Sequence, residues 1–294
     1  MIGAKSALSM LPSAFINPGD VVLMTVPGYP ILGTHTKWLG GEVVNLPLLK
    51  ENDFLPDLEQ IDLELLKRTK LLYLNYPNNP TGASATKKFF AKVVQFAKEH
   101  DIIVIHDAAY AALTFDGVKP LSFLSIPGAK EVGIELHSLS KSYNMTGWRI
   151  GYIVANEKFV ETAVKIHDSA SICACTIAQY GAIAALENDS KIVPEIVSNY
   201  KKRRDVIMGR LDNLSDYFEY VKPAGGYYIF PKIKFPHDNS ESVAEGMIKE
   251  CGVITVPGSA FGPIGESHLR LVFCISEDLI NRAFDRIDEF CRRV

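Results

Sequence analysis

The sequence predicts an α/β fold with a mostly parallel sheet and flanking helices, followed by a smaller α+β domain. Apolar, β-branched runs alternate with amphipathic stretches in the first part of the chain, a pattern typical of parallel strands joined by crossover helices. From about Lys191 the pattern changes to one long, basic helical stretch followed by short strands and helices. We therefore expect one domain at residues 1–195 and a second at residues 196–294.

The elements of the first domain follow from the spacing of its apolar residues. Ala7, Leu8, Leu11 and Phe15 recur at helical spacing and predict a helix close to the start of the chain. Strands are predicted at residues 21–26, 42–46, 70–75, 102–106, 133–139 and 149–155. Residues 87–99 lie between two of these strands and place apolar side chains on one helical face, so we expect a crossover helix there.

The second domain is predicted to start from a single long helix at residues 191–214. That stretch has no glycine or proline between Glu195 and Met208, so no residue within that part would break it. Short strands are expected at residues 218–221, 227–231, 253–256 and 268–273, and helices at residues 242–251 and 277–291.

Composition excludes several classes of function. The net charge of −3 over 294 residues gives no reason to expect nucleic acid or an anionic membrane as a partner, and no apolar run is long enough to span a bilayer. The five cysteines are scattered, and the Cys173–Cys175 spacing has no second pair that would complete a zinc site. We expect reduced thiols, no structural metal and a cytoplasmic protein.

One segment carries most of the chemical information. Lys141 follows an apolar strand, stands among small hydroxyl residues, and precedes Arg149 by eight positions. A lysine that forms an imine with an aldehyde cofactor needs a rigid, partly desolvated position with phosphate donors beside it. Ser138, Ser140 and Arg149 could provide those donors, although a surface loop would also contain such residues.

This segment resembles the lysine signature of the class I/II pyridoxal-phosphate aminotransferases, the aspartate-aminotransferase-like enzymes of fold type I. The resemblance covers nearly the whole chain, and the first half is most similar to bacterial LL-diaminopimelate or aspartate aminotransferases. The matching motifs, in order, are Pro27-Gly28-Tyr29-Pro30, Asn78-Asn79-Pro80-Thr81-Gly82, Asp107-Ala108-Ala109-Tyr110, the lysine segment, Pro223-Ala224-Gly225-Gly226-Tyr227 and the strand of Arg270.

The resemblance implies roles for these residues, with pyridoxal 5′-phosphate as the cofactor. Lys141 would be the Schiff-base lysine, and Asp107 would keep the pyridine nitrogen protonated, although an aspartate there could also cap the following turn. Tyr110 and Asn79 would bind the phenolic oxygen, although the turn composition around Asn79 needs no function. Tyr29 would stack on the ring or simply pack in its loop.

The remaining predicted site residues bind phosphate and substrate. Ala4 and Lys5 open a helix whose free N–H groups suit a phosphate, which Ser138, Ser140 and Arg149 would complete. Arg149 could instead be a strand-edge arginine. Arg270 would grip the substrate α-carboxylate, with Asn79 nearby, unless it pairs with a carboxylate of the protein itself. His106 and His137 are expected to be core histidines with hydrogen-bond partners.

The predicted function is transfer of an amino group between an amino acid and a 2-oxo acid such as 2-oxoglutarate, in amino-acid biosynthesis, by a homodimer. A pyridoxal-phosphate lyase on the same scaffold is an alternative, because the fold does not determine the reaction. In the resembled family the segment around Gly3 lies further into the chain. The sequence is therefore expected to be N-terminally truncated, and a catalytically impaired remnant is a second alternative.

Overall fold

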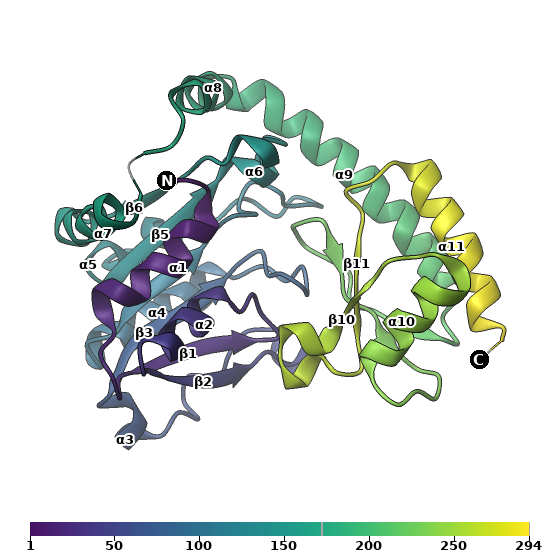
Figure 1. Ribbon diagram of the computed structural model, residues 1–294, viewed down its shortest axis with the longest axis horizontal. Helices are drawn as coiled ribbons and strands as arrows, with labels where there is room; N and C mark the ends of the chain where they lie inside the picture. The colour runs from purple at the N-terminus through teal and green to yellow at the C-terminus, as the bar shows by residue number, and fades with distance from the viewer. Residues whose placement is uncertain (172, 294) are drawn as a thin grey trace.

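The structure is a computed structural model that describes residues 1–171 and 173–293. Its first domain is built on a six-stranded sheet in the order β2-β1-β3-β4-β5-β6 (Figure 1). The strands are β1 (Val21–Val26), β2 (Glu42–Pro47), β3 (Thr69–Asn75), β4 (Ile103–Asp107), β5 (Gly133–Ser138) and β6 (Gly151–Ala155). The first five run parallel, while β6 is antiparallel to β5. The predicted, mostly parallel α/β sheet is therefore confirmed.

Helices cover both faces of this sheet and explain why the central strand β1 is buried along its whole length. Alternate side chains of β1 point to opposite faces, so that Val21 and Leu23 join one core cluster while Val22 and Met24 join another. The first cluster includes α4 (Lys87–Glu99), and the second includes α1 (Ala4–Phe15), α2 (Ile31–Trp38) and α7 (Glu157–Ala170). Short helices α3 (Leu63–Leu66), α5 (Ala129–Val132) and α6 (Leu139–Ser142) complete the domain.

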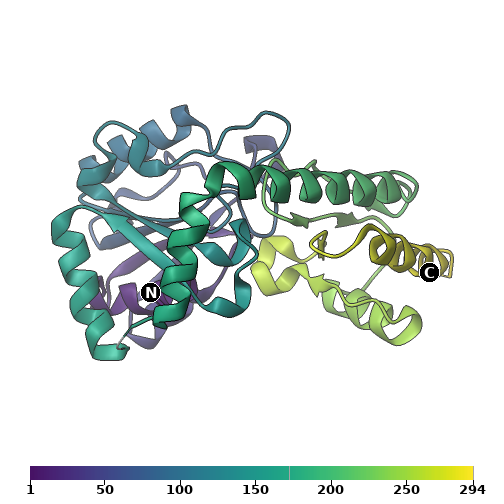
Figure 2. The same cartoon turned by 90° about the horizontal axis from the view of Figure 1, so that it is seen from above.

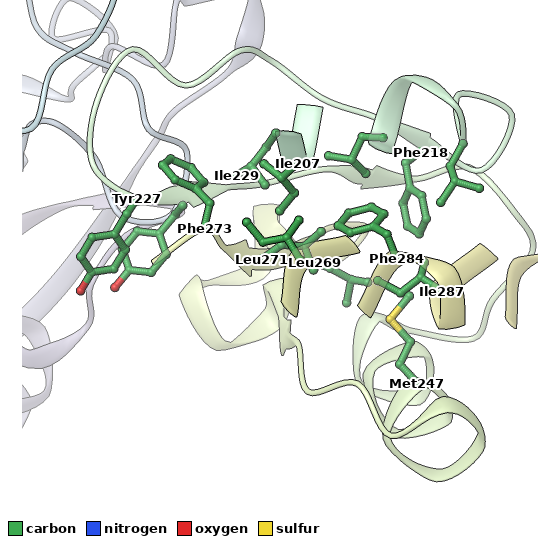
Figure 3. Packing of buried hydrophobic residues seen from close by; sticks show 14 of the residues in the cluster. Ile207, Phe218, Tyr227, Ile229, Met247, Leu269, Leu271, Phe273, Phe284 and Ile287 are labelled. Atoms are coloured by element: carbon green, nitrogen blue, oxygen red, sulfur yellow. The ribbon is translucent and has the colours of Figure 1, made fainter. Parts of the chain in front are cut away.

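Two helices connect the sheet to the C-terminal domain. They are α8 (Thr176–Glu187) and the long α9 (Asp189–Asp212), which runs from beside the sheet into the second domain (Figure 2). The C-terminal domain contains β7 (Phe218–Glu219), β8 (Tyr228–Ile229), β9 (Lys232–Ile233), α10 (Ser240–Cys251), β10 (Val256–Pro257), β11 (Leu269–Val272) and α11 (Glu277–Cys291). Its apolar core gathers side chains from α9, α10, α11 and the short strands (Figure 3).

The structure agrees with most of the predicted elements and corrects some of them. Helices at residues 87–99 and 277–291 have the predicted bounds. In the C-terminal domain three strands are shorter than predicted, the strand predicted at residues 253–256 lies instead at Val256–Pro257, and β9 was not predicted. The predicted strand at residues 149–155 begins only at Gly151, because Arg149 has a left-handed backbone with φ of 53°. The sequence analysis identified neither α2, α7 nor α8. The predicted domain boundary at residue 195 falls inside α9 and stays a prediction.

Among residues 1–171 and 173–293, no helix is both long enough and apolar enough to cross a membrane.

Candidate active site

A cavity of about 230 Å³ lies at the carboxyl ends of the parallel strands, between the sheet and the C-terminal domain. Ligands in open α/β sheets bind at this end because the loops there converge. All the residues predicted for the site line the cavity: Ala4, Lys5, Tyr29, Asn79, Asp107, Tyr110, Ser138, Ser140, Lys141, Arg149 and Arg270. Leu8, Asn75, Ala109 and Tyr228 also line it, and sequence analysis did not single them out.

Lys141 is positioned by the short helix that follows β5. Ser138 caps this helix, because its hydroxyl accepts a hydrogen bond from the Ser140 N–H at 3.2 Å. The Lys141 ammonium lies 5.3 Å from the centre of the Tyr227 ring. Burial is the main reason that the pKa of Lys141 is lowered, and the nearby Arg149 adds to the shift. The lysine is therefore more easily deprotonated than an exposed one, as an amine nucleophile requires.

Asp107 ends β4 with a buried carboxyl group that faces the cavity. One oxygen accepts from the Tyr73 hydroxyl and the other from the Ala109 N–H, each at 3.1 Å. Burial raises the pKa of Asp107, and these two hydrogen bonds partly oppose that rise. Asp107 thus caps the following turn and also presents a carboxylate to the cavity, so the two sequence interpretations are compatible.

The backbone of Asp107 is held by Asn75, one of the residues that sequence analysis missed. The Asn75 amide donates to the Asp107 carbonyl at 2.9 Å, and its oxygen accepts from the Asn79 N–H at 2.8 Å. Asn75 therefore joins the ends of two neighbouring strands. Its place at the last position of β3 was the available signal, because polar side chains at that edge face a site.

The start of α1 and Arg149 form one side of the cavity. The N–H groups of the first helical turn, which includes Ala4 and Lys5, have no acceptor within the helix and carry its positive dipole end. The Arg149 guanidinium donates to the Thr146 carbonyl at 2.8 Å and to the Ser140 hydroxyl at 3.4 Å. A Cβ at Gly3 would lie 2.4 Å from this guanidinium, so any side chain there would displace Arg149. The group suits a phosphate dianion.

Arg270, on β11, lines the cavity and has no carboxylate partner among the described residues. Its guanidinium donates to the Asn79 side-chain oxygen at 3.2 Å and lies 4.4 Å from the centre of the Tyr228 ring. The Arg270 Nε is buried and has no hydrogen-bond partner among the described residues. The alternative of an internal ion pair is therefore wrong, and Arg270 has a free donor for a carboxylate.

Two tyrosine hydroxyls meet beside this arginine. The Tyr110 and Tyr228 hydroxyls are 3.0 Å apart, and burial raises the pKa of Tyr110 well above its usual range. The Tyr110 hydroxyl therefore stays protonated and can donate to an anionic oxygen. Tyr228 directly follows the motif Pro223-Ala224-Gly225-Gly226-Tyr227, so its place beside that motif was the available signal in the sequence.

Tyr29 follows β1 and lines the cavity while part of its ring packs against the cluster beneath α1 and α2. Burial is the main cause of the raised pKa of its hydroxyl, which keeps it neutral. The structure thus brings its ring to the cavity, where it can pack against a flat ligand.

His106 and His137 surround a buried glutamate on the opposite face of the sheet from α1. Glu135 accepts from His106 Nδ1 at 3.0 Å, from His137 Nε2 at 2.7 Å and from the Phe123 N–H at 2.6 Å. Burial alone would raise the pKa of Glu135, but the hydrogen bonds from the two histidines lower it overall. The prediction of a core histidine with partners is confirmed for His106, which is fully buried, whereas His137 has the partner but is 23% exposed.

Comparison with known proteins identifies the family. The family model described as aminotransferase class I and II matches residues 1–287. The chain belongs to the class I and II aminotransferases. The cavity residues fit pyridoxal 5′-phosphate, since the start of α1 and Arg149 offer donors for a phosphate and the buried Asp107 carboxyl offers an acceptor for a ring nitrogen.

Relatives within this aminotransferase family are similar over most of the chain. The LL-diaminopimelate aminotransferase of Methanocaldococcus jannaschii is 48% identical over 280 residues, which cover 93% of this chain and 65% of that protein. The enzyme of the same name from Syntrophobacter fumaroxidans is 40% identical over 287 residues, covering 98% of this chain and 73% of that protein. The chain thus spans about two thirds to three quarters of the length of these relatives.

Solved structures of the family have the same fold. The apo BacF structure from Bacillus subtilis superposes with a TM-score of 0.94 at 37% identity, covering 98% of this chain and 73% of that one. The predicted fold type I architecture is therefore confirmed.

Proposed function

We propose that this aminotransferase-family chain binds pyridoxal 5′-phosphate and moves an amino group between an amino acid and a 2-oxo acid such as 2-oxoglutarate. One observation carries the proposal: eleven residues chosen from separate parts of the sequence line a single cavity around Lys141. Amino-group transfer with this cofactor needs four groups in one place. They are a half-buried lysine, a buried carboxyl group, donors for a phosphate and an arginine without a carboxylate partner.

Each group has a distinct task in the proposed reaction. The cofactor, when bound, supplies a conjugated electron sink beside the substrate. Arg149 and the start of α1 would hold its phosphate, and Asp107 would hold its ring nitrogen in the protonated form. The amine of Lys141 would take the proton from the substrate Cα and return it, and burial favours the deprotonated amine by lowering its pKa.

Arg270 is proposed to set the class of substrate. A planar guanidinium with a free Nε donor can bind an α-carboxylate in two parallel hydrogen bonds. The names of the two relatives support LL-diaminopimelate as the amino donor, in amino-acid biosynthesis. The cytoplasmic location suggested by the cysteine content stays a prediction.

We also propose that the chain works as a homodimer. The helix α8 presents four large apolar side chains to solvent at intervals of three residues, which are Ile177, Tyr180, Ile183 and Leu186. Because three residues turn an α-helix by about 300°, these side chains form a stripe that winds around the helix. Several exposed apolar side chains gathered on one surface helix are typical of a protein–protein contact. A second copy using the same face would form a two-fold symmetric contact.

Trapping of the cofactor tests the proposal directly. Purified protein is incubated with pyridoxal phosphate, reduced with borohydride, digested and mapped by mass spectrometry. We expect the label on Lys141, and we expect Lys141→Ala to lose both label and turnover, because imine exchange and proton transfer use the same amine. Lys165→Ala, an exposed lysine on α7, is the matched control and should retain both.

The substrate is tested with a panel of amino acids and 2-oxoglutarate as acceptor. Formation of glutamate supports an aminotransferase, whereas loss of a substituent without glutamate indicates a lyase. A chain that is labelled at Lys141 but turns over no amino acid would support the impaired alternative. Label on another lysine would show that the assignment of the site is wrong.

A further inference from the structure

Arg204 is the largest fully buried side chain of the described residues, and the candidate active site does not include it. It lies on α9, where its side chain is 1% exposed. An arginine is almost never buried to this degree unless its charge and its donors are all paired. Its contacts therefore show what the structure gains from holding a guanidinium at this position.

Every N–H donor of this guanidinium is used. Nη1 donates to Asp116 Oδ2 at 2.8 Å and to the Pro223 carbonyl at 3.2 Å, and Nη2 donates to Asp116 Oδ1 at 3.1 Å. Asp205 Oδ1 accepts from Nε at 3.1 Å and from Nη2 at 2.7 Å. These five hydrogen bonds match the five N–H groups of arginine, and the Asp116 pair is a two-pronged contact.

Two of these partners lie in segments that reach the cavity from different domains. Tyr110 lies in the loop after β4, and Asp116 follows it in the same segment of the first domain. Pro223 precedes β8 of the C-terminal domain, and β8 contains Tyr228. The Phe115 N–H donates to the Ala224 carbonyl at 3.0 Å and the Gly226 N–H to the Leu113 carbonyl at 2.8 Å. We call these two paired segments, residues 110–116 and 223–228, the tyrosine ribbon.

The tyrosine ribbon also holds the turn that contains Asn79. The N–H groups of Ala224 and Gly225 both donate to the Gly82 carbonyl, at 2.9 and 3.0 Å. A Cβ at Gly225 would lie 2.5 Å from Pro77, so the backbones approach as closely as glycine allows. A shift of the ribbon would therefore move three cavity residues together, which are Asn79, Tyr110 and Tyr228.

An ion pair with a buried arginine is a weak source of stability, because desolvating the charges offsets much of their attraction. The geometry of the contacts points instead to a positioning role. A planar guanidinium that donates to one carboxylate and one carbonyl fixes the two segments that carry them relative to each other. Lys222 also pairs with Asp116 at 2.8 Å, and Arg204 together with Lys222 holds the pKa of Asp116 well below its usual range. The carboxylate is thus charged at every pH at which the protein is assayed.

We propose that Arg204 is a positioning residue for the active site, which acts through Asp116 and Pro223 to hold the tyrosine ribbon and so fixes the hydroxyls of Tyr110 and Tyr228. The expected effect of Arg204 on cofactor binding rests on the proposed function. The expected effect of Arg204 on the backbone of the tyrosine ribbon is separate and does not depend on whether the cofactor binds. A residue of the long connecting helix would then control donors that belong to both domains.

The test compares Arg204→Lys and Arg204→Met with the control Arg210→Met. Lysine keeps the charge but lacks the fork, while methionine removes both and keeps the apolar stem. Arg210 lies on the same helix and pairs with Asp285 at 2.6 Å, away from the ribbon. Circular dichroism first establishes which variants are folded. If Arg204→Met is not folded, the two single variants Arg204→Lys and Asp116→Asn are compared instead.

The first measurement is hydrogen exchange of the chain without cofactor. We expect the amides of Phe115, Ala224, Gly225 and Gly226 to exchange roughly tenfold or more faster in both Arg204 variants, because local opening of the ribbon costs less. The control should show no change in these amides. Unchanged exchange in folded Arg204 variants would overturn the proposal.

The second measurement uses pyridoxal phosphate itself. We expect its affinity to fall about tenfold in Arg204→Met and less in Arg204→Lys, the effect of losing one well-placed charge-assisted contact. The pH midpoint of the visible absorbance of the bound cofactor should rise by about one unit, because a Tyr110 hydroxyl that is no longer in place cannot stabilise the charged oxygen. A purely structural ion pair would leave this midpoint unchanged.

The two proposals fail in different ways. If the unmutated chain does not bind pyridoxal phosphate, the proposed function fails, and hydrogen exchange alone decides whether Arg204 positions the ribbon. If the unmutated chain binds it and folded Arg204 variants keep its affinity and its midpoint, Arg204 has no positioning role and the proposed function stands.

Discussion

At the scale of single residues, burial pushes the two central ionisable groups toward their neutral forms. It lowers the pKa of Lys141 and raises the pKa of Asp107, because a low-dielectric site disfavours either charge. A neutral amine is the reactive form of the lysine. A cation placed against Asp107 would reverse its shift and keep the carboxylate charged, which is the arrangement that a protonated ring nitrogen requires.

Replacement of Asp107 tests this arrangement. We expect Asp107→Asn to bind pyridoxal phosphate but to lose kcat by at least ~10²-fold, the scale seen when a charge-stabilising partner is removed. Tyr73→Phe, which removes only the 3.1 Å hydrogen bond to this carboxylate, should lose much less. Steady-state kinetics with saturating cofactor give the comparison. A near-normal rate in Asp107→Asn would contradict the role.

Arg270 is tested by a substitution that keeps its charge. Lysine has no fork, so we expect Arg270→Lys to raise KM for both amino acid and 2-oxo acid, with a loss of roughly 2–4 kcal/mol in kcat/KM. Cofactor binding should be retained, because the phosphate donors lie on other elements. If amines without a carboxylate react as well as amino acids, Arg270 does not bind the substrate carboxylate.

At the scale of elements, the first turn of α1 and Arg149 depend on each other through a glycine. Gly3 has φ of +75°, and a Cβ there would meet the guanidinium of Arg149. The helix start and the arginine can share one phosphate only because this position has no side chain.

Gly3→Ala should therefore weaken cofactor binding. We expect the affinity for pyridoxal phosphate to fall about tenfold, since Arg149 must move away and a charge-assisted contact is lost. Gly19→Ala is the matched control, because Gly19 has φ of +87° but nothing within 4 Å of the added Cβ. Fluorescence titration measures both. Equal losses in the two variants would show that backbone strain alone is responsible.

The pairing of β4 with β5 contains the buried Glu135 between two histidines. We expect Glu135→Gln to lower the free energy of unfolding at pH 7 by about 3 kcal/mol, because a neutral amide leaves a buried histidine poorly paired. Urea titration measures the loss.

The pH dependence of this loss has a definite sign. The pKa of Glu135 is lower in the folded protein than in the unfolded chain, where a glutamate has a pKa of about 4.3. Its contribution is fully present above that pH and is lost as the pH falls toward the folded value. The difference between Glu135→Gln and the unmutated protein should therefore shrink below about pH 4.3. A difference that stays constant in acid would contradict this ionic role.

At the scale of the whole molecule, α8 gathers four exposed large apolar side chains on one helix. Ile177 and Tyr180 are 72% and 70% exposed, and they belong to the stripe of apolar side chains that winds along α8. The cavity, by contrast, is lined by residues of both domains, so the relative position of the domains matters for the site.

The α8 face predicts how the chain assembles. We expect a homodimer in sedimentation velocity, with Ile177→Glu combined with Ile183→Glu shifting it toward monomer, because charges would be buried without partners. Ile254→Glu, at a position 81% exposed in the C-terminal domain, should leave the dimer unchanged. A strict monomer at high concentration for the unmutated chain would contradict the proposal.

Local sequence determined the elements in which apolar residues recur at regular spacing over a long stretch. The bounds of α4 and α11 follow directly from their period, because one face of each must be buried. The strands of the first domain were found for the same reason, since both faces of a parallel sheet are covered. The site residues were found because their motifs resemble a family and stand at the ends of those strands.

Tertiary structure alone decided which side chains meet. The left-handed turn at Arg149, the antiparallel direction of β6 and the contacts of Arg204 have no signal in local periodicity. Each depends on partners far away in the chain, as when Arg204 on α9 bonds Asp116, 88 residues earlier. Local sequence restricts the backbone of a segment, but a hydrogen bond between distant segments forms only once packing has placed both of them.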